Sequence, residues 1–261
     1  MRDDPYAASR AHVENIAGKR EGPFLPEGRG VPAENGWRWI ADAWAFTSEQ
    51  RLTFVGVFVL LVLLQIVLSI VPLFGQVAAS VVFPALMGGF LLGCEAVRHG
   101  ERLEVGHLFA GFQRDASKLL TIGALSLAFG IVMVVIMFLV VGSSFAPFLL
   151  GGGEPRPEQV LDMLPQMLLA VCVILALSLP VTMAMLFAPA LVVFADFDVV
   201  PALKTSFLVC LKNIMPFLIW SIAILVLSIL AAIPFLLGWL LLGPVMMVSL
   251  YLAYRDTFYG V

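Results

Sequence analysis

Residues 52–97 read LTFVGVFVLLVLLQIVLSIVPLFGQVAASVVFPALMGGFLLGCEAV, and Glu95 is the one residue among them that carries a formal charge. A membrane-spanning helix needs about 20 apolar residues, because it rises about 1.5 Å per residue and the hydrocarbon core is about 30 Å thick. The stretch is long enough for two such helices, with a turn at VPLFG, residues 71–75. It therefore predicts a pair of membrane-spanning helices.

The composition of the whole chain agrees with this stretch. Of the 261 residues, 61% are hydrophobic and 13% are charged, and the charged share is about half that of an ordinary soluble domain. So few charges could not cover the surface of a soluble protein of this size. The composition excludes a soluble enzyme, a nucleic-acid binder, a disordered chain and a disulfide scaffold. It indicates an all-α integral membrane protein.

Six apolar runs meet or nearly meet the length that one crossing needs. The fourth run is longer than necessary and contains Pro180 and Pro189. We expect a kink or a break there, because proline removes an amide donor and clashes with the preceding turn. The sixth run is the shortest. The predicted spans are Leu52–Leu73, Val77–Val97, Leu119–Val141, Met167–Ala195, Ile214–Pro234 and Leu236–Tyr254.

The basic residues indicate how these spans are oriented. With six spans, fourteen of the fifteen Lys and Arg residues fall in 1–51, 98–118, 196–213 and 255–261, which share one side. The opposite side keeps Arg156, which lies beside acidic residues. Because short loops rich in Lys and Arg stay in the cytoplasm, this asymmetry predicts that both termini are cytoplasmic.

The first fifty residues divide into two parts. Residues 1–36 combine prolines, glycines and mixed charges, which predicts a flexible cytoplasmic tail ahead of a polytopic membrane domain at residues 37–261. Residues 37–51, WRWIADAWAFTSEQR, are amphipathic. Trp favours the headgroup level, where its ring is buried and its N–H stays wet. This segment therefore predicts a helix that lies on the cytoplasmic membrane surface.

Two later segments, residues 107–120 and 202–218, resemble residues 43–54. In each, small and apolar residues precede a phenylalanine, a basic residue follows five or six positions later, and a long apolar run comes next. The pattern predicts three copies of one unit (surface helix, span, span) with pseudo-threefold symmetry, and chance similarity between apolar segments is the alternative. The predicted membrane-interface anchors on the three surface helices are Trp37, Trp39, Trp44, Phe109, Phe112 and Phe207.

Several phrases of the sequence resemble a known family. They are LFAGF at residues 108–112, FAPALVVF at 187–194, the stretch 202–216 and LAYRDTF at 252–258. The chain resembles an uncharacterised family of proteobacterial inner-membrane proteins. More distantly, it is similar to the membrane domain attached to some glycerophosphodiester phosphodiesterases. The resemblance implies a fold and a location in the bacterial inner membrane, but it implies no catalytic residues.

No pattern in the sequence predicts catalysis. The three histidines and three cysteines lack the mutual spacing that a metal site needs. No glycine-rich loop with a lysine is present to hold a phosphate. We therefore predict no catalytic, cofactor or metal site, and a protein that is not an enzyme.

Three features of the spans each have two interpretations. Glu95 lies near the cytoplasmic end of the second span with Arg98 one turn on, which favours an interfacial ion pair over a functional carboxylate. Gly89 and Gly93 allow a helix to approach closely, either within the fold or from a partner. Prolines in the second helix of each pair either curve that helix or leave a cavity. These prolines are Pro84, Pro180, Pro189 and Pro244.

The spans contain no deeply placed charge, so the sequence favours a non-enzymatic protein of the inner membrane. Its expected role is that of an accessory or scaffolding component of a membrane complex. Its expected partners are the lipid bilayer and another membrane protein, and nucleic acid is not among them. The alternative is a passive transporter or lipid-handling protein, which would carry a lipid or a small solute.

Overall fold

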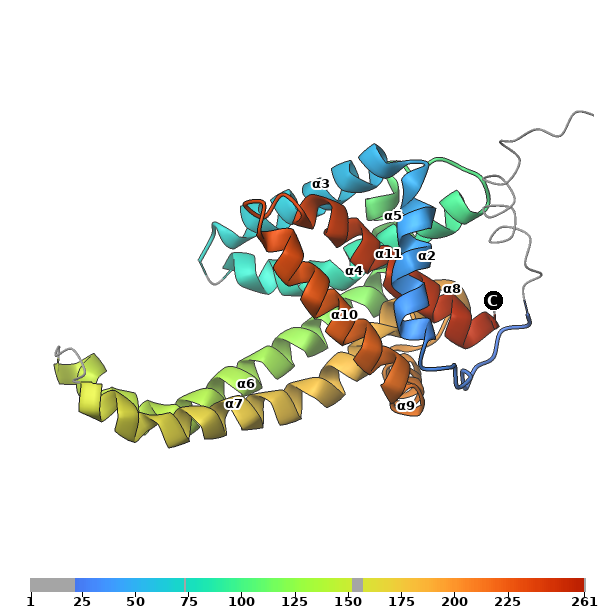
Figure 1. The fold of residues 1–261 in the computed structure, drawn as a ribbon. Helices are drawn as coiled ribbons and strands as arrows, with labels where there is room; N and C mark the ends of the chain where they lie inside the picture. Colours follow the sequence, from blue (N-terminus) through green and yellow to red (C-terminus); the bar gives the residue numbers. More distant parts are fainter. Residues whose placement is uncertain (1–21, 73, 152–156, 261) are drawn as a thin grey trace, which may run out of the picture.

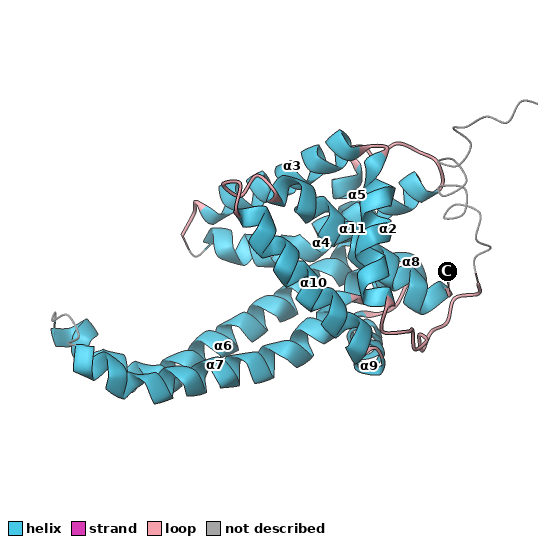
Figure 2. Ribbon diagram, viewed as in Figure 1, coloured by secondary structure: helices cyan, strands magenta, loops and turns pink. Residues whose placement is uncertain are grey.

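The computed structural model describes residues 22–72, 74–151 and 157–260, with the backbone alone at 141, 143–151 and 157–163. These residues form helices and no strands (Figure 2), which confirms the predicted all-helical fold. The helices are α2 (Asn35–Ser48), α3 (Arg51–Ser69), α4 (Phe74–Arg98), α5 (His107–Arg114), α6 (Ala116–Gly151), α7 (Pro157–Leu186), α8 (Ala188–Ala195), α9 (Val199–Lys212), α10 (Ile214–Ala232) and α11 (Trp239–Tyr259).

Five stretches of helix are long and apolar enough to cross a membrane. They are Arg51–Ser69, Phe74–Arg98, Ala116–Val140, Leu164–Ala195 and Ile214–Ala232, and they match the first five predicted spans. The sixth predicted span, Leu236–Tyr254, forms most of α11, which does not belong to this set. The physical reason is that the last turns of α11 are polar and include Arg255 and Asp256.

The fourth apolar run is broken between α7 and α8, as its prolines predict. Pro189 lies at the start of α8 and Pro180 lies inside α7. At the break, the backbone N–H of Phe187 donates to the hydroxyl oxygen of Ser206 (3.0 Å), and that hydroxyl donates to the carbonyl of Met183 (2.7 Å). A side chain of α9 therefore joins two backbone groups that an unbroken helix would pair with each other.

Short and long helices alternate in a regular order along the chain. The short helices α2, α5 and α9 each precede a pair of long helical segments. Each short helix packs mainly on the second segment of a different pair: α5 on α4, α9 on α7 and α8, and α2 on α11. The contacts of the three short helices therefore link all three pairs to one another.

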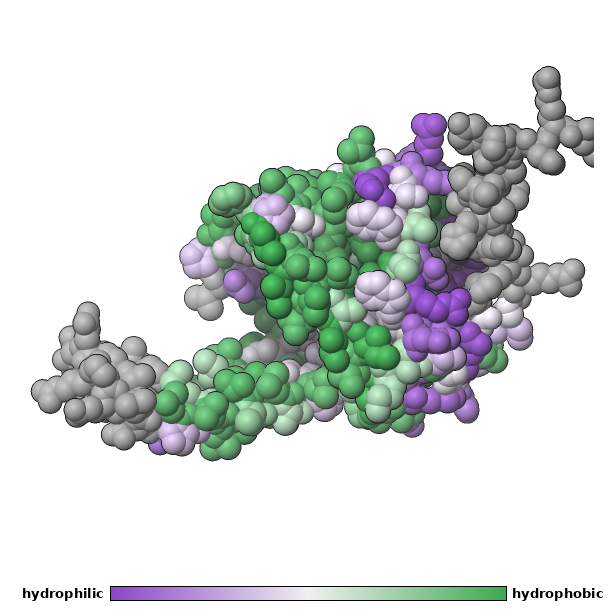
Figure 3. Space-filling model, in the orientation of Figure 1, coloured by the Kyte–Doolittle hydropathy of each residue, from purple (hydrophilic) through white to green (hydrophobic). Residues whose placement is uncertain are grey.

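The α6–α7 hairpin extends away from the rest of the molecule (Figure 1). α6 has 36 residues and α3 has 19, so their lengths are about 54 Å and about 28 Å. The hairpin exposes large apolar side chains, among them Phe138 and Leu175. Figure 3 shows hydrophobic residues over this hairpin, α3 and α10, whereas hydrophilic residues gather beside α2 and the C-terminal end of α11.

Candidate functional site

Ionisable and polar side chains meet around the C-terminal half of α11, in an arrangement that we call the α11 hub. Its first half joins α11 to α4 and consists of Glu95, Arg98, Tyr251 and Arg255. Its second half joins α11 to the N-terminal part of the chain and consists of Arg29, Asn35, Trp39 and Asp256.

Glu95 is the centre of the first half of the α11 hub. Its Oε2 accepts a hydrogen bond from the Tyr251 hydroxyl (2.5 Å), and its Oε1 accepts from Nη2 of Arg98 (2.7 Å). Nη1 of Arg255 lies 3.7 Å from the same Oε1. The carboxylate therefore does form the ion pair with Arg98 that the spacing suggests, and it also fixes α4 to α11.

Asp256 is the centre of the second half, and its side chain is 9% exposed. Its carboxylate accepts hydrogen bonds from Nδ2 of Asn35 (2.7 Å) and Nε1 of Trp39 (2.9 Å), and it forms an ion pair with Arg29. Nε of Arg29 also donates to the backbone carbonyl of Asp256 (2.8 Å). Three donors therefore compensate for removing this carboxylate from water.

Residues 22–34, here called the strap, lie along the hub. The backbone N–H groups of Leu25 and Arg29 donate to the carbonyls of Phe258 (2.8 Å) and Thr257 (2.9 Å). On the other side of the strap, Asn213 exchanges hydrogen bonds with backbone groups of Val31 (2.8 Å) and Arg29 (2.9 Å). The strap is the second part of the predicted tail, and residues 1–21 lie outside the described residues.

The six predicted membrane-interface anchors differ in exposure. Trp37 (53% exposed), Trp44 (46%) and Phe109 (43%) lie on the surface, and Phe112 and Phe207 are half-buried. Trp39 is buried (3% exposed) and belongs to the α11 hub, so lipid does not reach it. The sequence alone does not distinguish Trp39 from Trp37 and Trp44, because the packing of α2 on α11 decides which face of α2 is buried.

The predicted glycine pair lies against α5. A methyl group added at Gly89 would lie 2.3 Å from the carbonyl oxygen of Leu108, and one added at Gly93 would lie 2.6 Å from a methyl group of Leu103. The close approach that these glycines permit is therefore used within the fold.

The prolines do not gather around one cavity. Pro84 and Pro189 are buried, and Pro180 is exposed. Pro244 is buried inside α11 and borders a closely packed contact between α2, α3 and α11 that has no room for a water molecule.

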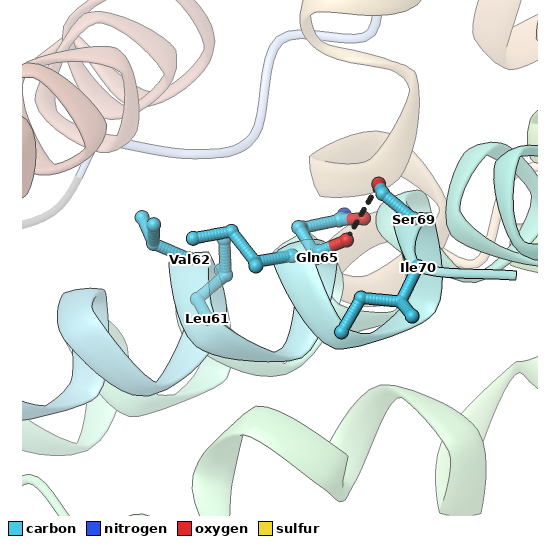
Figure 4. A pocket seen from close by; sticks show the side chains of 6 residues that line it. Leu61, Val62, Gln65, Ser69 and Ile70 are labelled. Carbon is cyan, nitrogen blue, oxygen red and sulfur yellow. Dashed lines mark hydrogen bonds between the residues drawn. The ribbon is translucent and has the colours of Figure 1, made fainter.

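An open groove with a volume of about 410 Å³ follows the C-terminal half of α3 (Figure 4). Gln65 and Ser69 are the polar residues in its lining, and the Ser69 hydroxyl donates to the backbone carbonyl of Gln65 (2.7 Å). The remaining lining is apolar and comes from Leu61, Val62, Ile66 and Ile70. Because the serine hydroxyl is bonded within its own helix, the Gln65 side chain is the main polar group on an otherwise apolar groove surface.

Outside the hub, the pKa values of Asp196 and Cys210 are shifted from their ordinary values. A hydrogen bond from Lys118 (2.6 Å) lowers the pKa of the exposed carboxyl of Asp196. Burial raises the pKa of the Cys210 thiol to about 12, so this thiol stays protonated at neutral pH. Within the described ranges, His, Cys, Asp and Glu side chains form no group that could hold a metal ion.

Sequence reasoning missed the second half of the α11 hub. The sequence feature that could have revealed it is the adjacent charged pair Arg255–Asp256, which ends an otherwise apolar helix within LAYRDTF, residues 252–258. The partners Arg29 and Asn35 could not be found from spacing, because they lie more than 200 positions away.

The helical fold, the five candidate spans and the structural hub define a multi-pass membrane protein. It is similar to a protein of Burkholderia thailandensis named "Probable inner membrane protein", with 28% identity over 189 residues, which are 70% of this chain and 69% of the relative. No family model and no solved structure matches the chain. The comparisons show no link to glycerophosphodiester phosphodiesterases, so that more distant resemblance stays a prediction.

Proposed function

We propose that this chain is a non-enzymatic protein of the bacterial inner membrane and an accessory or scaffolding component of a membrane complex. The α6–α7 hairpin is the observation that carries the proposal. α6 is about 54 Å long, against a hydrocarbon core of about 30 Å, and side chains such as Phe138 and Leu175 project from the hairpin unburied. Such a hairpin offers a long apolar face on which the spans of another membrane protein can pack.

The α11 hub supports the non-enzymatic part of the proposal. Glu95 and Asp256 are each engaged by several donors from neighbouring helices or the strap. Carboxylates held in this way fix the relative positions of helices, and they are not poised to exchange protons with a substrate. The relative's name supports the location in the inner membrane.

The proposal includes six spans, with α11 as the sixth and both termini in the cytoplasm. Fourteen of the fifteen Lys and Arg residues then share the cytoplasmic side. The proposed short surface helices are α2, α5 and α9, whose outward faces carry apolar side chains such as Trp44, Phe109 and Leu208. The cyclic packing of these helices on the preceding pairs supports three copies of one unit.

Native mass spectrometry of the protein, extracted gently from its own membrane, tests the scaffolding role. We expect a stoichiometric protein partner whose occupancy falls in the variants Phe138→Ala and Leu175→Ala. Leu225→Ala on α10 is the matched control, since Leu225 is 61% exposed and Leu175 is 62% exposed. Extraction of the protein without any partner would contradict the proposal.

Lipid handling is the second candidate, and the α3 groove favours it. Its length along one helix and its apolar lining suit an acyl chain. The test is scrambling of labelled lipid, and flux of small solutes, in liposomes that contain the purified protein. Inert liposomes would exclude this alternative.

A further inference from the structure

Gln65 places a carboxamide in the apolar part of α3, about 21 Å along a helix that is about 28 Å long. No residue that the structure describes forms a hydrogen bond with this side chain. The hydroxyl of Ser69, one turn further on, donates to the backbone carbonyl of Gln65 instead. An amide without a partner costs free energy in hydrocarbon, where water cannot take the partner's place. A second polar group beside Gln65 would remove this cost.

The groove beside Gln65 has the shape that another helix fills. Its lining forms two rows on α3, and within each row every residue lies four positions after the one before it. The rows are Leu61, Gln65, Ser69 and Val62, Ile66, Ile70. Side chains with this spacing form ridges on a helix, and the ridge of one helix packs into the groove of another. The groove is open, and Ile66 is 53% exposed, so a helix can reach it from the membrane.

A second copy of this chain would supply both the ridge and the polar group. Two copies are inserted in the same direction in one membrane, so Gln65 lies at the same depth in each. A two-fold axis along the membrane normal brings the same patch of α3 from each copy together. A carboxamide both donates and accepts, so two Gln65 side chains can form two reciprocal N–H···O hydrogen bonds. A partner of different sequence would need a matching polar group at this same depth.

We propose that the α3 groove is a homodimer contact, in which Gln65 bonds to Gln65 of a second copy and the apolar rows of the two α3 helices interlock. Ser69 favours this contact, because a small residue lets two helices approach closely in a membrane. The inference does not depend on the scaffolding role, since α3 and the α6–α7 hairpin lie on opposite sides of the molecule (Figure 1).

The test measures energy transfer between donor-labelled and acceptor-labelled full-length protein in liposomes, over a range of protein-to-lipid ratios. Wild-type protein should dimerise reversibly. Gln65→Leu should weaken dimerisation by about tenfold, as expected for the loss of one or two hydrogen bonds between membrane helices. Gln65→Asn keeps the amide on a shorter side chain and should give an intermediate value. Thermal unfolding of each variant checks that the fold is kept.

Gln76→Leu is the matched control, because Gln76 is an exposed amide on the neighbouring helix α4 and does not line the groove. It should dimerise like the wild type. Equal dimerisation of wild type and Gln65→Leu would overturn the proposal. A monomer that retains a phospholipid in a Gln65-dependent way would also overturn it, since an acyl chain would then occupy the groove.

Cysteine cross-linking tests the position of the two-fold axis. In a Cys172→Ser background, where Cys94 and Cys210 are buried, oxidation should join two copies of Ile66→Cys through a disulfide. Leu225→Cys on α10 should not cross-link, although Leu225 is 61% exposed and Ile66 is 53% exposed. Equal cross-linking of the two variants would contradict the proposed contact, because it would indicate random collisions.

Discussion

Arg255 and Asp256 are neighbours in the sequence, but they form ion pairs on different sides of α11. Successive residues of a helix point about 100° apart, so one side chain can reach Glu95 on α4 while the next reaches Arg29 on the strap. Each charge lies in a largely buried position with an opposite charge close by. Removing one partner would leave the other desolvated and unpaired, which costs more than the pair contributes.

Asp256→Asn should destabilise the protein and release the strap. The amide loses the charge that pairs with Arg29. Its NH2 group cannot accept a hydrogen bond, so either Arg29 or the two donors Asn35 and Trp39 lose their acceptor. We expect a loss of about 2 kcal/mol in the free energy of unfolding, less than for a fully buried pair because the Arg29 side chain is 40% exposed. Thermal unfolding in detergent measures this loss.

Limited trypsin digestion tests the release of the strap directly. Cleavage after Arg29, recognised by a fragment that begins at Gly30, should be faster in Asp256→Asn than in the wild type. Asp198→Asn is the control, because the Asp198 side chain is 83% exposed and should change stability by less than about 0.5 kcal/mol. Unchanged cleavage in Asp256→Asn would mean that the strap is held by its other bonds, to the backbone of α11 and to Asn213, without the Asp256 carboxylate.

At the scale of helices, α4 is fixed on two sides. Gly89 and Gly93 bring it against α5, and Glu95 bonds it to α11. These contacts lie within two turns of one helix, near its C-terminal end. The C-terminal half of α4 is therefore packed tightly, whereas helices such as α3 and α10 expose most of their surface.

Gly89→Ala should separate α4 from α5. Its new methyl group would overlap two backbone carbonyls, of His107 and Leu108, which cannot move without shifting the helix. We expect a loss of roughly 1–3 kcal/mol in the free energy of unfolding in mixed micelles. Gly130→Ala in α6 should instead be stabilising by up to about 1 kcal/mol, since nothing lies within 4 Å of the added methyl group. Similar losses in both variants would rule out the close contact as the cause.

Glu95 and Tyr251 should be energetically coupled, because their hydrogen bond joins α4 to α11. A double-mutant cycle of Glu95→Gln and Tyr251→Phe should give a coupling energy of about 1–2 kcal/mol, as for a bond to a charged acceptor. Trp220→Phe serves as the reference, since Trp220 bonds to Ser249 and not to Glu95. Its cycle with Glu95→Gln should give no coupling, and coupling there would point to a general weakening of the bundle.

The helices show which parts of this fold the sequence can predict. The apolar runs predict five candidate spans, and Pro189 predicts the break before α8, because both depend on local chemistry. The burial of Trp39 and the docking of Arg29 depend on α11, more than 200 residues away. α6 also continues to Gly151, past the predicted end at Val141, since apolar composition marks a span and not the end of a helix.

At the scale of the whole molecule, the membrane arrangement depends on α11. Its first turns are apolar, but its end is tied to polar groups of α4 and the strap. If α11 crosses the membrane, the hub lies at the cytoplasmic surface together with the basic loops. If it does not, the C-terminus lies on the opposite side from the N-terminus, which conflicts with the bonds that join the end of α11 to the strap.

Cysteine labelling in intact spheroplasts distinguishes the two arrangements. In a Cys172→Ser background, where the two remaining native thiols are buried, an impermeant maleimide should label Leu237→Cys in the turn between α10 and α11. A cysteine appended to the C-terminus should react only after lysis, as should Ser48→Cys on α2. Labelling of both Leu237→Cys and the C-terminal cysteine from outside would leave five spans. It would also place the α11 hub away from the cytoplasmic face, in conflict with the distribution of Lys and Arg on which the proposed orientation rests.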